Sequence, residues 1–186
     1  MIGEICKSPN LKRLKEIKQE MGDNCKIYVE IGVLYGGSMI MMMDINYPCL
    51  HIGIDPFTGY YGKSYDPHRK IDLTNHYDIT SENIRQYNKY CQEWKLIKGK
   101  SSEVINLVPH NIDFLFIDGD HSYNGVYQDF MDYKLKINKN GLIVFDNYND
   151  ECWPEVKKAV DKIVSSYKQY FKVKEIFGNC LVLQKN

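Results

Sequence analysis

Short apolar runs alternate along the chain with longer stretches in which apolar residues recur every three or four positions. The runs are typical of strands buried on both faces of a sheet, and the longer stretches are typical of amphipathic helices. The predicted strands cover residues 27–31, 49–55, 94–97, 112–117, 141–145, 171–177 and 180–184. The predicted helices cover residues 9–21 behind a Ser8 cap, a methionine-rich stretch after residue 37, Thr80 or Ser81 to about Gln92, a stretch from Ser101 with Val104, Ile105 and Val108 as its apolar face, and residues 123–136 and 151–167.

The order of these elements predicts the fold. Five strands alternate with helices, which is typical of a mostly parallel sheet covered on both faces. The last two strands flank Gly178-Asn179, and this short spacing indicates an antiparallel hairpin. We therefore expect an α/β, Rossmann-like, mostly parallel seven-stranded sheet with a C-terminal hairpin. The length of 186 residues predicts a single domain over residues 1–186.

Composition narrows the partners of such a domain. Lys+Arg and Asp+Glu both total 24, so the net charge is zero and the chain lacks the electrostatic footprint of a nucleic-acid-binding protein. The N-terminal residues MIGEICKSPN lack the apolar core of a signal peptide, and no apolar run is long enough to span a bilayer. We expect a soluble, cytoplasmic protein that binds neither nucleic acid nor membrane. The sequence leaves the oligomeric state open, and a homodimer is one alternative.

The six cysteines are scattered along the chain. None forms a C-x-x-C pair, and none stands near a histidine at zinc-finger spacing. Single cysteines in a chain of this size mostly behave as small core hydrophobes. We therefore predict neither disulfides nor a cysteine metal site.

Polar residues follow two of the apolar runs at the points where the strands end. Asp118 and Asp120 follow the first run, and Asp146 and Asn147 follow the second. If the two strands are neighbours, these oxygen-bearing side chains lie together at one edge of the sheet. Such hard ligands suit Mg²⁺ or a similar cation. The alternative is that they only cap strands and start helices.

A glycine-containing turn after the first strand gives a second site signal at the same edge. The segment VEIGVLYGGS joins a buried strand to a helix, and glycines allow backbone to approach a ligand closely. Its spacing is not G-x-G-x-x-G, which argues against a nicotinamide cofactor. Asp55 ends the next strand 23 positions after Gly32 (55 − 32), where an acid can bind a ribose diol. Residues 57–77 are polar and aromatic without a clear hydrophobic period. We predict that this loop is a lid that covers the substrate; the alternative is a surface loop without a function.

The motifs in their order resemble a known family. The segments VEIGVLYGGS, IGIDPF, LIKGKSSEVI, FLFIDGDHSY and IVFDNY resemble class I methyltransferases over about residues 27–148. The last two segments resemble the metal-dependent small-molecule O-methyltransferases, which include catechol, caffeoyl-coenzyme A and macrocin-type sugar enzymes. This resemblance implies an S-adenosylmethionine cofactor, a divalent cation, with Mg²⁺ as the expected ion, and a hydroxyl acceptor on a small molecule or carbohydrate.

The resemblance also implies roles for individual positions. Asp118, Asp146 and Asn147 match the metal ligands, and Asp118 or His121 would accept the proton of the acceptor hydroxyl. His121 stands where several members carry a lysine, and a histidine titrates near neutral pH and can serve as a base. The implied cofactor contacts are Glu30, Gly32, Gly36 and Ser38 at the amino-acid end, Asp55 at the ribose, Ser101 and Ser102 at the adenine, and Asp120 near the amino group.

Two other functions fit the same sequence. A methyltransferase of this fold can work without metal, the acids then serving cofactor and structure only. A protein that binds S-adenosylmethionine or a nucleotide without catalysis is the second alternative. Activity that survives a chelator would favour the first, and cofactor binding without turnover would favour the second.

Overall fold

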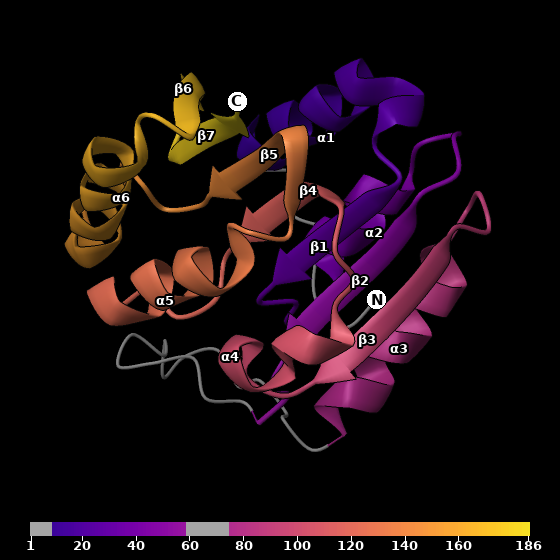
Figure 1. Cartoon of the computed structure of the whole chain (residues 1–186). Helices are drawn as coiled ribbons and strands as arrows, with labels where there is room; N and C mark the ends of the chain where they lie inside the picture. The colour runs from indigo at the N-terminus through magenta and orange to yellow at the C-terminus, as the bar shows by residue number, and fades with distance from the viewer. Residues whose placement is uncertain (1–8, 59–74) are drawn as a thin grey trace.

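A computed structural model describes residues 9–58 and 75–186 of the chain. Its centre is a seven-stranded sheet in the order β3-β2-β1-β4-β5-β7-β6, and Figure 1 shows helices on both faces of it. The pairs among β1 to β5 are parallel, and β7 pairs antiparallel with both β5 and β6. The strands are β1 (Ile27–Ile31), β2 (Leu50–Asp55), β3 (Glu93–Lys98), β4 (Ile112–Ile117), β5 (Ile137–Phe145), β6 (Phe171–Phe177) and β7 (Cys180–Lys185). The predicted mostly parallel sheet with a C-terminal hairpin is confirmed.

The helices divide into two groups, one for each face of the sheet (Figure 1). The first group packs on one face and consists of α1 (Pro9–Met21), α2 (Gly37–Met43) and α3 (His76–Tyr87). The second group packs on the other face and consists of α4 (Ser101–Val104), α5 (Tyr123–Tyr133) and α6 (Pro154–Tyr167). None of the helices in the described ranges is long and apolar enough to cross a membrane.

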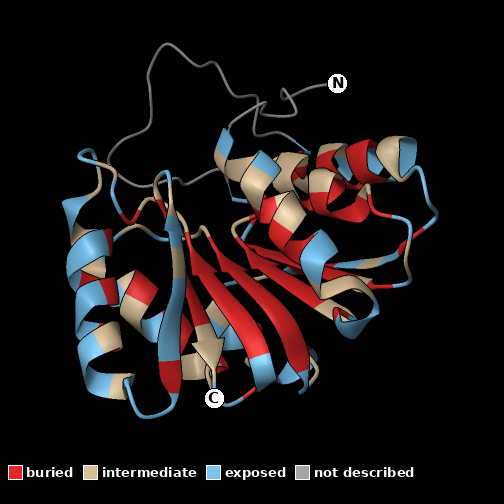
Figure 2. Cartoon of the chain, turned by 90° about the horizontal axis from the view of Figure 1, so that it is seen from above, coloured by how far each residue is buried: buried red, intermediate tan, exposed pale blue. Residues whose placement is uncertain are grey.

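Burial on both faces explains why the central strands read as continuous apolar runs. In β4, Leu115 and Ile117 pack with α5 and α6, whereas Phe114 and Phe116 pack with α1 and α2. Side chains alternate between the faces of a strand, so a strand covered on both sides needs apolar residues at every position. Figure 2 shows these central strands as the buried layer of the molecule. Burial of this layer is the main favourable term in folding the domain.

The order of the strands reverses at the boundary between β1 and β4, which are parallel neighbours. From β1 the strands proceed to β2 and β3 on one side, and from β4 to β5 on the other. Ligands of such sheets bind outside the carboxyl ends of the strands at this switch point. The residues after β1 and β4 therefore occupy the position where a site is expected.

Two boundaries of α3 differ from the prediction. The helix begins at His76 and ends at Tyr87, so Thr80 and Ser81 lie inside it and do not cap it. Their hydroxyls donate to backbone carbonyls four residues earlier, at 2.9 Å in both cases, which lets these residues stay in a helix interior. The Thr80 hydroxyl also donates to Leu34 O at 2.7 Å and so fastens α3 to the turn after β1.

Other predicted helices are shorter in the structure. The helix at Ser101 is one α-turn followed by a 3₁₀ turn, because Val108 precedes Pro109 and is extended. The helix predicted for residues 123–136 ends at Tyr133, since Ile137 pairs with Ile112 as the first residue of β5. The helix predicted from Glu151 begins at Pro154. The predicted Ser8 cap and most of the predicted lid, residues 59–74, lie outside the described residues.

Candidate functional site

The turn after β1 is shaped by two glycines with positive φ. Gly32 has a φ of 90°, and a Cβ at this position would collide with the backbone carbonyl of Asp118. Only glycine lets the end of β1 approach the end of β4 this closely. Gly36 has a φ of 84° and leads into α2. Gly32 is therefore required by the close approach of two strand ends, whereas the sequence analysis attributed the glycines to the approach of a ligand.

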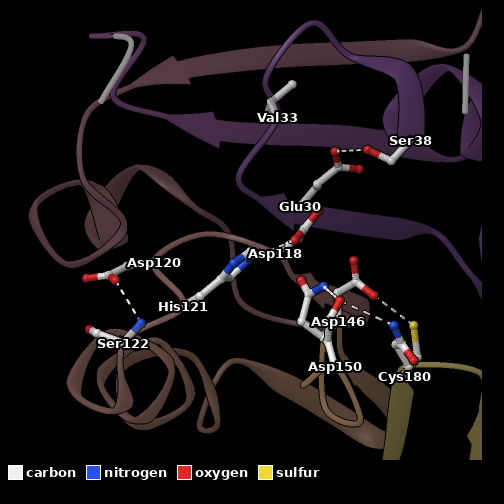
Figure 3. A network of polar contacts seen from close by, with 12 residues as sticks. Glu30, Val33, Ser38, Asp118, Asp120, His121, Ser122, Asp146, Asp150 and Cys180 are labelled. Atoms are coloured by element: carbon white, nitrogen blue, oxygen red, sulfur yellow. Dashed lines mark hydrogen bonds and ion pairs between the residues drawn. The ribbon is translucent and has the colours of Figure 1, made fainter. Parts of the chain in front are cut away.

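Glu30 lies on β1, just before this turn, as a buried carboxyl group. It is 0% exposed, and it accepts hydrogen bonds from Tyr28 Oη and Ser38 Oγ, each at 2.5 Å. Burial raises the pKa of Glu30 to about 8, although the two hydroxyl donors oppose the shift. Glu30 and Ser38, both predicted at the cofactor, are therefore joined in one network (Figure 3). Tyr28, which the sequence reasoning missed, completes it.

Asp55 holds the same turn from the end of β2. One carboxylate oxygen accepts the backbone N–H groups of Val33 at 3.0 Å and Leu34 at 3.1 Å, and the other accepts that of Phe57 at 2.7 Å. The side chain is thus committed to fixing the backbone between β1 and α2. A carboxylate retains further lone pairs, so its predicted ribose contact stays a prediction.

Asp118 and Asp146 end the neighbouring strands β4 and β5. Ile117 and Phe145, the residues just before them, are register partners, and Asp146 N donates to Ile117 O at 3.1 Å. Burial raises the pKa of Asp118 to about 6, and the negative charge of Asp146 raises it further against the opposing effect of His121. The predicted convergence of these two acids is confirmed by their position at one sheet edge (Figure 3).

His121 faces Asp118 at the start of the segment that leads into α5. Its Nε2 lies 3.2 Å from Asp118 Oδ1, and its ring packs edge-on against Trp153, 4.6 Å between centroids. Burial lowers the pKa of His121, but the hydrogen bond and the charge of Asp118 outweigh it, so the net shift is upward. The side chains of His121 and Asp118 remain 20% and 30% exposed, so both can still reach a ligand.

Asn147 and Cys180 complete the surroundings of Asp146. Asn147 has a φ of 56°, and its amide nitrogen donates to Asp150 Oδ2 at 3.3 Å. The buried thiol of Cys180, on β7, donates to Asp146 Oδ1 at 3.1 Å. Sequence reasoning missed Cys180, because the antiparallel register that brings β7 beside β5 carries no signal at a single cysteine.

The donor set at this edge fits a hard divalent cation. Two carboxylates and an amide oxygen are ligand types of Mg²⁺ and Ca²⁺. Burial is the main cause of the raised pKa of Asp118, and the negative charge of Asp146 adds to it; a cation would relieve both effects. No group of three His, Cys, Asp or Glu side chains within residues 9–58 and 75–186 is arranged to hold a metal ion. A cation held here would therefore depend on Asn147 as its third protein ligand.

The two serines predicted at the adenine differ in their environment. Ser101 is half-buried and donates its hydroxyl to Asp129 Oδ1 on α5, whereas Ser102 is exposed. Tyr133 Oη also donates to Ser101 O at 2.9 Å. Burial raises the pKa of Asp129 to about 7, and Ser101 opposes this shift. Sequence reasoning missed Asp129, because it lies on the buried face of an amphipathic helix.

Asp120 does not join the Glu30 network. It is exposed, and its Oδ1 accepts the backbone N–H of Ser122 at 2.9 Å, while Ser122 caps α5 through Gly125 N at 3.1 Å. Figure 3 shows Asp120 on the α5 side of the site, apart from Glu30 and Ser38. In this structure Asp120 organises the start of α5, and its predicted contact with the cofactor amino group stays a prediction.

Comparison with known proteins places this geometry in context. Residues 29–148 match the family described as "Methyltransferase domain". The chain is 37% identical over 139 residues to the "Uncharacterized protein R132" of Acanthamoeba polyphaga mimivirus, a match that covers 74% of this chain and 59% of that protein. The chain thus spans less than two thirds of this relative.

Solved structures share the fold at low sequence identity. The O-methyltransferase NovP superposes with a TM-score of 0.73 at 20% identity, covering 95% of this chain and 79% of NovP. An O-methyltransferase from Bacillus cereus in complex with SAH superposes with a TM-score of 0.70 at 17% identity, covering 100% of this chain and 84% of that chain. These similarities establish the architecture around the sheet edge described above.

Proposed function

Because the chain belongs to the Methyltransferase domain family, we propose that it is an S-adenosylmethionine-dependent O-methyltransferase acting on a hydroxyl of a small molecule or sugar. The observation that carries the proposal is that Asp118, after β4 at the switch point, and Asp146, after the neighbouring β5, lie at the same sheet edge as the pair of Glu30 on β1 and Ser38 on α2. This arrangement puts acidic oxygen ligands next to the position where such sheets bind cofactors. The two solved O-methyltransferases that share the fold agree with this class of acceptor.

The chemical problem in this reaction is the weak nucleophilicity of an alcohol. A divalent cation bound to Asp118, Asp146 and Asn147 would lower the pKa of an acceptor hydroxyl. His121 would take the proton; the 3.2 Å contact of its Nε2 with Asp118 Oδ1 and the partial exposure of its side chain support this role. Its raised pKa means that the protonated product form is stabilised by Asp118.

The remaining residues have positioning roles in the proposal. Glu30 and Ser38 would bind the amino-acid end of the cofactor, and Ser101 would face the adenine. Trp153 limits the rotation of the His121 ring by packing against it at 4.6 Å. Holding the acceptor oxygen in line with the methyl carbon can lower the activation free energy by several kcal/mol, on the order of 7 for ideal alignment.

Methyl transfer from labelled S-adenosylmethionine tests the proposal on a panel of sugars, nucleotide sugars and catechols. Each reaction is run with Mg²⁺ and with EDTA, and SAH binding is measured by calorimetry on the same samples. Asp146→Ala is expected to abolish metal-stimulated transfer while SAH affinity stays within about threefold, because Asp146 lies outside the Glu30 network. Asp23→Ala is the matched control, since this carboxylate is exposed at the opposite end of the sheet.

The alternatives give different results in the same assay. Methyl transfer that survives both EDTA and Asp146→Ala would refute the metal role and support a metal-independent methyltransferase of the same fold. SAH binding without transfer to any acceptor would identify a non-catalytic binding protein. Absence of SAH binding would refute the whole proposal.

A further inference from the structure

The turn of the C-terminal hairpin, residues 178–180, lies beside the acid that follows β5. Phe145 at the end of β5 and Leu181 on β7 are antiparallel register partners. In an antiparallel pair, the residue after one partner lies opposite the residue before the other. The register therefore puts Asp146 opposite Cys180, the first residue of β7. The proposed methyl transfer gives this hairpin turn no role.

The thiol of Cys180 occupies one side of the Asp146 carboxylate. Cys180 is 2% exposed, and its Sγ lies 3.1 Å from Asp146 Oδ1. An ionised carboxylate has no proton to donate, so the thiol is the donor. Within residues 9–58 and 75–186, Asp146 Oδ2 has no hydrogen-bond partner. The contact with Cys180 thus holds one oxygen of the carboxylate and leaves the other for a cation.

Asp150 makes a corresponding contact with the predicted amide ligand. Its Oδ2 accepts the side-chain N–H of Asn147 at 3.3 Å and that of Asn179, in the hairpin turn, at 3.4 Å. These two contacts are long, so each is weak by itself. The Asp150 Oδ1 accepts the backbone N–H of Cys152 at 2.9 Å, which fixes the carboxylate. Because a carboxylate only accepts hydrogen bonds, it holds the nitrogen end of the Asn147 amide and leaves the oxygen end for a cation.

The hairpin turn therefore contacts both predicted ligands of β5 from outside the site. It reaches Asp146 directly and the amide ligand through Asp150 (Figure 3). Its backbone is fastened to the same loop, because Tyr148 N donates to Asn179 O at 2.6 Å. Groups that hydrogen-bond metal ligands in this way set their orientation, and their loss typically lowers metal affinity about 10- to 100-fold.

We propose that the hairpin turn and Asp150 form the outer shell of the proposed cation site. In this shell Cys180 orients the Asp146 carboxylate, and the Asn147 amide is oriented by the Asp150 carboxylate. The inference rests on the proposed function, since it takes these ligands, together with Asp118, as the holders of the cation. Cys180 and Asp150 are positioning residues, because each acts through a ligand. The C-terminal hairpin thus contributes to the site without supplying a ligand itself.

Loss of the thiol donor has two opposing effects on a bound cation. A hydrogen bond donated to a carboxylate stabilises its negative charge, so loss of the donor alone would tighten cation binding. Loss of the orientation lets the Asp146 side chain rotate, and binding must then restrict it again, which weakens cation binding. The sign of the change therefore distinguishes a thiol that orients Asp146 from one that only satisfies its carboxylate.

Mn²⁺ is the probe, because it takes oxygen ligands in octahedral geometry as Mg²⁺ does. Its binding is measured in the full chain, with SAH and without acceptor, by the loss of the electron paramagnetic resonance signal of the free ion. Cys180→Ala is expected to weaken Mn²⁺ binding about tenfold, whereas Cys180→Ser keeps a hydroxyl donor and should stay within about threefold of the unaltered chain. Cys25→Ala is the matched control, since Cys25 is also buried but precedes β1 at the opposite end of the sheet.

A second pair of variants tests Asp150. Asp150→Ala and Asp150→Asn remove the same negative charge, but the asparagine keeps an oxygen that accepts the Asn147 amide. Asp150→Ala is expected to bind Mn²⁺ more weakly than Asp150→Asn, and equal affinities would exclude the orienting role of Asp150. Asp150 is only partly buried, so this pair decides the outcome if Cys180→Ala folds poorly.

The same assay separates this inference from the proposed function. Asp146→Ala should abolish Mn²⁺ binding; absence of binding by the unaltered chain, or unchanged binding by Asp146→Ala, would overturn the metal role and the outer shell together. If the unaltered chain binds Mn²⁺ and Asp146→Ala does not, unchanged or tighter binding by Cys180→Ala would overturn the role of Cys180 alone. Equal weakening by Cys180→Ala and Cys180→Ser would assign the effect to packing and would also overturn that role.

Discussion

Glu30 is expected to lose its proton when the cofactor binds. The carboxyl group is fully buried between two hydroxyl donors, and its pKa is raised to about 8. At pH 7 it is therefore about 0.9 protonated in the free protein. The amino-acid end of S-adenosylmethionine or SAH carries an ammonium, and a cation at this distance favours the charged carboxylate.

The number of released protons follows from this pKa. If Glu30 is fully ionised in the complex, SAH binding releases about 0.9 proton at pH 7, about 0.5 at pH 8 and about 0.1 at pH 9. Titration calorimetry in buffers of different ionisation enthalpy measures this number as the slope of binding enthalpy against buffer enthalpy. Glu30→Gln keeps the shape of the side chain and should remove most of the slope.

Ser38→Ala is the matched control, because it removes one hydroxyl donor and leaves the glutamate. Its slope should stay close to that of the unaltered chain. A slope near zero at pH 7 in a chain that binds SAH, or equal slopes with and without Glu30, would contradict the assignment of Glu30 to the amino-acid end of the cofactor.

The same ionisation gives an independent stability prediction. The pKa of Glu30 is raised from 4.5 in the unfolded chain to about 8 in the folded one. Its contribution to stability is thus complete below pH 4.5 and is lost as pH rises to about 8, on the order of 5 kcal/mol in total. Urea denaturation at pH 5 and pH 8 should show a smaller difference in Glu30→Gln than in the unaltered chain. Equal differences would show that Glu30 is not buried in its charged form at high pH.

Three further predictions concern the turn, the predicted adenine contact and the base. Gly32→Ala should destabilise the fold by at least about 2 kcal/mol in urea denaturation, because its positive φ and the Asp118 carbonyl exclude a Cβ; a loss below half of this would contradict the close approach. Asp129→Ala should weaken SAH binding about tenfold by releasing the Ser101 hydroxyl, with Glu103→Ala, exposed on the same helix, as the control and an unchanged affinity as the opposing result. His121→Gln should remove the rise of kcat/KM with pH above 6.5 and lower the rate at least about 100-fold, and a retained pH profile would exclude the base role.

The fold could be predicted from sequence because its strands carry a strong local signal. A strand buried on both faces needs apolar residues at each position, and Ile112 to Ile117 meets this requirement without reference to its neighbours. The sequence also places Asp118 and Asp146 at strand ends, and parallel pairing brings such ends to one edge. Helix ends have weaker sequence signals, and tertiary contacts explain why several observed ends differ from the predicted ones. Thr80 appeared to be a cap by its residue type, but its hydroxyl bonds the turn after β1 from inside α3.

By itself, the sequence determined the order of the elements, the edge at which the acids gather and the turn that needs glycine. Only the tertiary structure decided which side chains satisfy those acids, because their partners come from segments far apart in the chain. Cys180 lies 34 positions from Asp146 and reaches it through the antiparallel register of β7 on β5. Asp129 lies 28 positions from Ser101 and reaches it through the packing of α5 against α4. A pattern of apolar spacing reports which face of an element is buried, but it carries no information on which polar group on another element lies opposite.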